Sequence, residues 1–178
     1  MEQVAAQAGV EKANIYYYYK GKEQLYRALM DGIIDRFLQE VTEFLKQPQN
    51  PGDSFALLDG FLDTFFGLVE RYQSLVTLAI GELIHPPRKK SGRSSVTEML
   101  EQVEALGASL VAEGIRKGHF REQDPAQAVV TLEGALFHYF FLPDERVQAL
   151  TGAAKFDPDN LKRRRAALRQ QIRSVLAR

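Results

Sequence analysis

The sequence contains no cysteine. Disulfides, thiolate zinc sites, iron–sulfur clusters and cysteine nucleophiles are therefore excluded. Long apolar runs are also missing. The longest stretches without a charged residue, such as residues 72–81, have ten residues, whereas a membrane span needs about 20 apolar residues. The chain does not open with a basic segment followed by an apolar stretch, so we expect no signal peptide and a cytoplasmic protein without membrane contact.

The net charge is zero, because 23 Lys and Arg balance 23 Asp and Glu over 178 residues. This balance excludes a globally basic nucleic-acid binder but leaves room for a local basic patch. The charge is unevenly placed: residues 1–30 carry +1, residues 31–85 carry −6, residues 86–93 carry +4, residues 94–160 carry −6 and residues 161–178 carry +7. Only the two ends and one predicted loop would not repel DNA.

Strand patterns are absent, and apolar residues recur every three or four positions, which predicts an all-α fold. A break is expected at 47–52 and a basic loop at 86–94. Ser95 and Glu98 have capping-box spacing, Gly118 suits a helix end, and Asp124 before Pro125 suits a helix start. The predicted helices span residues 22–46, about 55–69, 73–85, 95–117, 125–142 and 157–178, with a short irregular piece after Pro143.

The helix from Pro125 to Leu142 is apolar on nearly every side. Such a helix must be covered all round, and a small helical domain covers one side. We therefore predict a homodimer in which this helix and the C-terminal helix form a twofold four-helix interface. The alternative is that one chain buries the helix completely.

The first 26 residues have the outline of a helix-turn-helix, with two short helical pieces joined by a turn containing Gly9. Ala5 is the small residue expected where the two helices touch. The residues expected to point inward are Val4, Ala8, Val10 and Ile15.

Residues 9–25 read GVEKANIYYYYKGKEQL. This segment resembles the recognition-helix signature of the TetR family of transcriptional regulators, in which Gly-Val, a Lys, an aromatic pair and a later Lys-Glu recur at this spacing. A weaker resemblance covers residues 113–125, at the joint between two late helices of that family's ligand-binding domain. The resemblance implies a helix-turn-helix head at residues 1–30, incomplete at its N-terminal side because the family has a further helix there, and a helical ligand-binding and dimerisation domain at residues 31–178. We expect the natural protein to begin upstream; the alternative is a truncated head.

The resemblance also implies which side chains contact double-stranded operator DNA. Lys12, Ala13 and Asn14 fall at the start of the recognition helix, where side chains reach base edges in the major groove; Asn pairs with adenine and Lys with guanine acceptors. Lys22 matches a phosphate-binding lysine at the start of the next helix. The aromatic positions expected at phosphates and thymine methyls are Tyr16, Tyr17 and Tyr18, while Tyr19 is expected in the head's core.

The resemblance further implies an apolar cavity for a small-molecule effector. Aromatic side chains are plentiful enough to line one, although for any single one of them ordinary core is the better explanation. Glu133 is the one acid within the apolar helix; it would pair with a cationic ligand or form a hydrogen bond across the dimer. The predicted ligand-binding residues are Phe61, Phe65, Phe66, Tyr72, Leu106, Leu110, Glu133 and Phe137.

Catalytic and metal-binding patterns are missing. The three histidines are far apart, and no phosphate loop, nucleophile elbow or zinc-binding helix occurs, so we expect no enzyme, no metal and no cofactor. Asp59 and Asp63 are predicted on a solvated face. The basic last helix is predicted as the solvated back of a dimer helix; the alternative is a membrane-binding or nucleic-acid-binding helix.

The sequence thus predicts a ligand-responsive DNA-binding regulator, a repressor that releases its operator when a small, largely apolar molecule binds the C-terminal domain. The alternative is a small-molecule-binding helical dimer whose incomplete head no longer binds DNA.

Overall fold

The computed structural model describes residues 1–46, 53–85 and 94–178, and within these residues every regular element is an α-helix. The predicted break at 47–52 and most of the predicted basic loop lie outside the described residues. The helices are α1 Glu2–Ala8, α2 Lys12–Tyr18, α3 Lys22–Lys46, α4 Ser54–Arg71, α5 Gln73–Ile84, α6 Ser95–Arg116, α7 Pro125–Phe141, α8 Asp144–Thr151 and α9 Pro158–Leu176.

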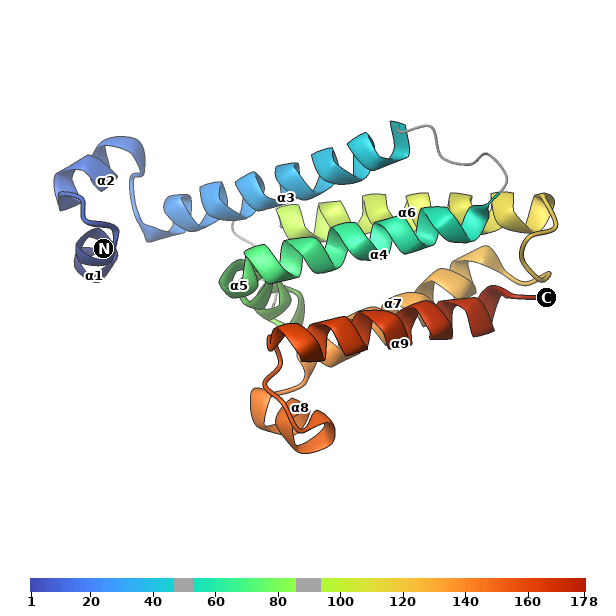
Figure 1. Cartoon of the computed structure of the whole chain (residues 1–178). Helices are drawn as coiled ribbons and strands as arrows, with labels where there is room; N and C mark the ends of the chain where they lie inside the picture. The colour runs from blue at the N-terminus through green and yellow to red at the C-terminus, as the bar shows by residue number, and fades with distance from the viewer. Residues whose placement is uncertain (47–52, 86–93) are drawn as a thin grey trace.

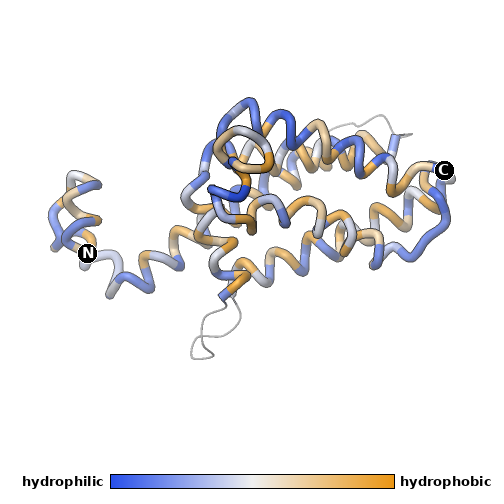
Figure 2. The backbone as a smooth tube through the Cα atoms, turned by 90° about the horizontal axis from the view of Figure 1, so that it is seen from below, coloured by the Kyte–Doolittle hydropathy of each residue, from blue (hydrophilic) through white to orange (hydrophobic). Residues whose placement is uncertain are grey.

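Two short helices form a head at one end of the long helix α3, and the remaining helices form a bundle along its other end (Figure 1). In the bundle, α3 packs on α4, α5 and α6, while α7 packs on α6 and α9, and α9 also packs on α4. Figure 2 shows the hydrophobic segments concentrated where these helices face each other. Helix α3 runs without a break through residue 30, the predicted end of the head. It therefore belongs to both the head and the bundle.

The helix starts follow the capping rules. The side chains of Asp53 and Asp124 each accept hydrogen bonds from two backbone amides in the first turn of α4 and α7, and Asp157 caps α9 by accepting from the amide of Asn160. At α6 the predicted cap is wrong. The capping oxygen belongs to Ser94, and Ser95 instead donates a hydrogen bond to Asp31 of α3 at 2.5 Å. The sequence pattern cannot separate two adjacent serines when one of them has a tertiary partner.

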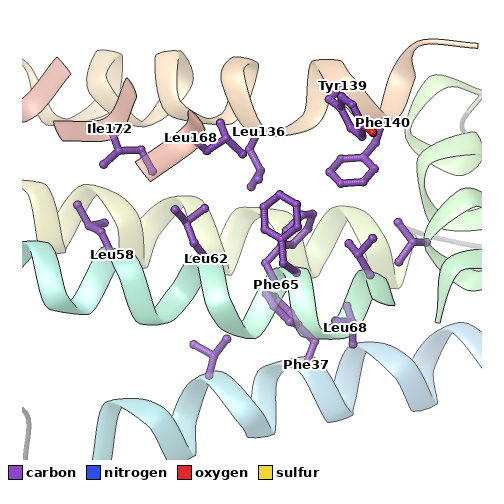
Figure 3. Packing of buried hydrophobic residues seen from close by; sticks show 14 of the residues in the cluster. Phe37, Leu58, Leu62, Phe65, Leu68, Leu136, Tyr139, Phe140, Leu168 and Ile172 are labelled. Carbon is purple, nitrogen blue, oxygen red and sulfur yellow. The ribbon is translucent and has the colours of Figure 1, made fainter. Parts of the chain in front are cut away.

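The core lies between α3, α4, α6, α7 and α9. Its centre is aromatic: Phe65 of α4 makes edge contacts with Phe66, Phe137 and Phe140 at centroid distances of 5.7, 6.0 and 5.6 Å. Figure 3 shows Phe65 and Phe140 facing each other across this centre. Phe66 is completely buried. Such contacts add about 0.5–1.5 kcal/mol each beyond the area they bury.

The irregular piece predicted after Pro143 contains a helix, α8, which the sequence pattern missed because only Val147 of its eight residues is buried. The loop after it is held by buried polar groups. The Tyr139 hydroxyl donates to the Lys155 carbonyl at 2.6 Å and accepts from the Asn160 amide at 3.0 Å. The Lys155 ammonium donates to the Phe140 carbonyl and pairs with Asp144 at 3.0 Å.

Candidate nucleic-acid interface and ligand cavity

The head is built on the turn between α1 and α2. Gly9 ends α1 in the left-handed conformation, with φ of 65°, which glycine adopts without the steric cost of a Cβ. The amide of Val10 then donates to the carbonyl of Ala5 at 3.1 Å. Ala5 and Ile15 are both buried and α1 packs on α2, so the turn fixes the orientation of α2 against α1.

Two of the residues expected to point inward do not. Val4 is half-buried, but Ala8 and Val10 are exposed. Ala8 is the last residue of α1 and Val10 lies in the turn, so both lie past Ala5, the buried residue of α1.

The predicted DNA-contacting side chains of α2 are exposed. Lys12, Ala13 and Asn14 form the first turn of α2 and are all exposed. Tyr17 is 82% exposed and Tyr18 70% exposed, and their rings meet edge to face at 5.0 Å. Tyr16 is also exposed, whereas Tyr19 is half-buried. Large apolar surface held in water at the tip of a head is typical of a surface that binds a partner.

The start of α2 is held by a charge pair. The Lys12 ammonium donates to the Glu2 carboxylate at 2.6 Å, and this hydrogen bond raises the pKa of Lys12 and lowers the pKa of Glu2. Both groups are well exposed, so the pair contributes little to stability and can open when a phosphate or a base edge competes for the lysine. Glu11 stands at the N-cap position without a side-chain hydrogen bond to the helix.

Lys22 is the first residue of α3 and is exposed. The turn before it is ordered by Gln24, whose side-chain oxygen accepts the backbone amide of Lys20 at 2.6 Å. The free amides at a helix start favour an anion there. Lys22 thus stands beside α2 at a place suited to a phosphate.

A cavity of about 90 Å³ lies between α4, α6, α7 and α9. Figure 3 shows Leu58 and Leu62 on one wall pointing toward Leu168 and Ile172 on the other. The lining is apolar apart from one carboxyl group, that of Glu133, and it consists of Leu58, Phe61, Leu62, Val103, Leu106, Gly107, Leu110, Val111, Val129, Leu132, Glu133, Leu136, Phe137, Leu168 and Ile172.

Five of the eight predicted ligand-binding residues line this cavity: Phe61, Leu106, Leu110, Glu133 and Phe137. The other three do not. Phe65 and Phe66 pack in the aromatic core next to it. Tyr72 ends α4, where its hydroxyl accepts a hydrogen bond from Arg36 at 2.7 Å.

The other aliphatic lining residues were missed because nothing in a sequence separates a leucine that borders empty space from one that packs fully. Their one available sign is membership of the apolar stripes of the predicted helices, which the buried core residues share.

Glu133 is the polar group of the cavity. Its Oε1 atom is buried and has no hydrogen-bond partner. Burial raises the pKa of Glu133 to about 7, and the negative charge of Glu104 on α6 contributes to the same shift. An unpaired buried carboxylate is costly, so this group is poised to take a partner.

The wall between α4 and α9 is closed by charge pairs. Arg173 pairs with Asp59 at 2.6 Å, Arg165 pairs with Asp63 at 3.4 Å, and Arg169 lies between them, bonded to Asp63. The predicted solvated face is confirmed for Asp63, which is exposed, but not for Asp59, which is half-buried, and both aspartates are paired with arginines of α9. The long side chains of the arginines reach across the helix seam, which a pattern within one helix does not reveal.

The histidines occupy unrelated places: His119 shares a hydrogen bond with Ser54 at 2.8 Å, while His85 and His138 are exposed. No group of three or more side chains suited to a metal ion occurs in the part of the chain that the structure describes. None of the helices in that part combines the length and the apolarity needed to cross a membrane.

Comparison with known proteins agrees with this arrangement. Residues 1–29 match the family model of bacterial regulatory proteins, tetR family. The HTH-type transcriptional regulator RutR of Escherichia coli O157:H7 is 26% identical over 160 residues, which cover 88% of this chain and 71% of RutR.

Solved structures share the fold. A TetR transcription regulator from Haloarcula marismortui superposes with a TM-score of 0.70 at 19% identity, covering 93% of this chain and 85% of that one. The structure of AibR in complex with isovaleryl coenzyme A and operator DNA superposes with a TM-score of 0.68 at 18% identity, covering 96% and 84%.

The head matches the family in sequence, the relatives are regulators rather than enzymes, and the helical body has the fold of solved TetR regulators. The chain is thus similar to transcriptional regulators of the TetR family in the sequence of its head and in the fold of its helical body.

Proposed function

We propose that this regulator is a dimeric repressor that leaves its operator when a small, largely apolar molecule enters the cavity between α4, α6, α7 and α9. The observation that carries the proposal is the position of α3. This helix carries the head at one end and packs on two cavity-lining helices, α4 and α6, along the other. In AibR, whose fold is similar, a solved structure holds both a small-molecule thioester and operator DNA.

DNA binding in this proposal uses the surface of the head. Asn14 and Lys12 read base edges, the exposed tyrosines contact phosphates and thymine methyls, and Lys22 binds a phosphate. The exposure of all these side chains supports the assignment, and so does the match of residues 1–29 to the family model. We propose the same division of the chain as above, a head of residues 1–30 and a ligand-binding body of residues 31–178.

Release follows from the small volume of the cavity. An apolar cavity of about 150 Å³ admits a molecule the size of benzene, so an effector larger than this must part the helices around a space of about 90 Å³. Such a ligand shifts the equilibrium toward the wider state by its difference in affinity for the two states. The link to the head is short, because Ser95 at the start of α6 is hydrogen-bonded to Asp31 of α3 at 2.5 Å.

The dimer brings two heads to half-sites one turn of DNA apart. The outward face of α7 supports this assignment: Val130 is 62% exposed, Phe141 is 41% exposed, and Gly134 has open space around it. The outer face of α9 next to it carries small side chains, Ala166 and Ala167. These surfaces suit close packing of two copies through α7 and α9.

The test is fluorescence anisotropy of the chain on DNA from upstream of its own gene and on scrambled DNA, at two salt concentrations. We expect selective binding. Asn14→Ala should lose about 1–3 kcal/mol on the native site alone, while Lys22→Ala should weaken both DNAs equally and lower the salt slope by about one. Lys46→Ala, at the far end of α3, is the matched control and should leave the affinity for both DNAs unchanged. Weak binding without selectivity would contradict the proposal and favour a ligand-binding dimer without DNA binding.

A further inference from the structure

Glu133 contributes the one carboxyl group to a cavity whose lining is otherwise apolar. The other fourteen residues that line this space present apolar surface, and the Oε1 atom of Glu133 is buried there without a hydrogen bond. A buried carboxyl group without a partner costs free energy that a ligand recovers by pairing with it. The missing partner of Glu133 therefore indicates which chemical group the ligand presents to it.

The protein supplies no cation for this carboxyl group among the described residues. The arginines of the neighbouring helix α9 are engaged elsewhere: Arg169 and Arg173 pair with aspartates of α4. Arg164 donates to the Ala135 carbonyl and lies over the Tyr139 ring. The walls from α4 and α9 meet the cavity with aliphatic and phenyl side chains.

The charged group that α6 brings toward Glu133 is a second carboxylate, Glu104, and its negative charge makes ionisation of Glu133 harder. A neutral hydrogen-bond acceptor on the ligand would satisfy a protonated Glu133 but would leave this repulsion in place. A positive charge on the ligand relieves both, because it attracts the two carboxylates at once.

Two phenyl rings, those of Phe61 and Phe137, line the same space. Faces of aromatic rings attract cations, and the attraction grows when the pair is shielded from water. The cavity thus combines an unpaired carboxyl group, a second negative charge and aromatic walls, in a volume of about 90 Å³.

We infer that the effector of this regulator is an apolar cation, a compact aliphatic or aromatic amine whose ammonium group pairs with Glu133 while its hydrocarbon part fills the cavity. The inference rests on the proposed function, in which this cavity is the effector site, and it adds the chemical class of the ligand. Glu104 strengthens the attraction from α6 without lining the space.

The experiment compares three probes that share a six-carbon chain: n-hexylamine, hexan-1-ol and hexanoate. Their binding to the full chain is measured by isothermal titration calorimetry at pH 8, where Glu133 is mostly ionised, and release of operator DNA is followed by anisotropy. We expect hexylamine to bind at least about tenfold more tightly than hexanol, with hexanoate the weakest, and to release the DNA at the lowest concentration.

Glu133→Gln keeps the size of the side chain and removes its charge. It should abolish the preference for the amine and leave hexanol binding within about twofold. Glu122→Gln removes an exposed carboxylate outside the cavity and is the control for attraction of amines to the acidic surface. It should leave the affinities for hexylamine and hexanol unchanged. Leu106→Trp, which fills the cavity, should weaken hexanol and hexylamine together.

The outcomes separate the two proposals. If hexanol binds and releases the DNA as well as hexylamine does, or if Glu133→Gln keeps the preference for the amine, the cationic class is wrong and the effector site stands. If none of the three probes binds the wild-type chain, the cavity is not an effector site, and both proposals fall.

Discussion

Replacement of Glu133 by glutamine should change how the stability of the protein depends on pH. The carboxyl group lies in an apolar cavity near a second carboxylate, Glu104, and its pKa rises from an ordinary 4.5 to about 7. The folded state therefore holds the proton more tightly than the unfolded chain. The resulting stabilisation is complete below pH 4.5, declines as the pH rises toward 7 and is absent above that value.

The size of the effect follows from the shift. One pKa unit corresponds to about 1.4 kcal/mol, so the whole shift would amount to about 3 kcal/mol. The residue as a whole is half-buried although Oε1 is not accessible, and water at the accessible side screens part of the cost. We therefore expect the wild type to lose about 1–2 kcal/mol of unfolding free energy between pH 5 and pH 8 through Glu133.

The assay is urea unfolding of the wild type and of Glu133→Gln at pH 5 and at pH 8, followed by circular dichroism. Glutamine cannot ionise, so the variant should gain about 1–2 kcal/mol relative to the wild type on going from pH 5 to pH 8. Glu122→Gln should show an equal difference from the wild type at both pH values. A difference between wild type and Glu133→Gln that is the same at pH 5 and pH 8 would refute the claim that burial penalises this carboxylate.

Three further changes test other parts of the structure. Gly114→Ala would place a Cβ 2.2 Å from the ring of Phe120, which is buried, and we expect a loss of about 1–3 kcal/mol in urea unfolding. Val130→Glu puts a charge on the exposed face of α7 and should convert the proposed dimer to monomer in analytical ultracentrifugation with the helix content unchanged. Tyr26→Phe removes the 2.7 Å hydrogen bond from α3 to Glu82 of α5 and should cost about 0.5–1.5 kcal/mol in thermal unfolding.

The order of the helices could be read from the sequence because most of them begin and end with chemistry that is local to the chain. Aspartates at positions 53, 124 and 157 cap α4, α7 and α9 as their side chains allow, and Gly118 takes a positive φ after α6. The predictions that failed concern features that depend on tertiary contacts. Ser95 bonds to α3 instead of capping its own helix, and α8 has too few buried residues to leave a pattern.

The head was predictable in more detail than the cavity for a related reason. Most of the residues predicted to contact DNA lie close together on one short helix, α2, so a motif of a few residues specifies them together. The lining of the cavity comes from four helices, and its members are ordinary leucines, valines and phenylalanines. Phe61 lines the space while Phe65, one turn later, packs in the core, and this difference depends on how the helices are rotated against one another.

Glu133 lies on α7 between the face that borders the cavity and the face that is exposed. Leu132, Leu136 and Phe137 line the cavity together with Glu133. Val130 and Phe141 are exposed and follow on the adjoining stripe, because residues three and four apart lie on the same side of a helix. The Oε1 atom of Glu133 is buried without a hydrogen-bond partner, which supports the proposed pairing with a cationic effector, and the exposed stripe beside it is the surface proposed for the second copy of the chain. Glu133→Gln together with Val130→Glu tests the two roles separately, because the first removes the charge in the cavity and the second adds one on the exposed stripe.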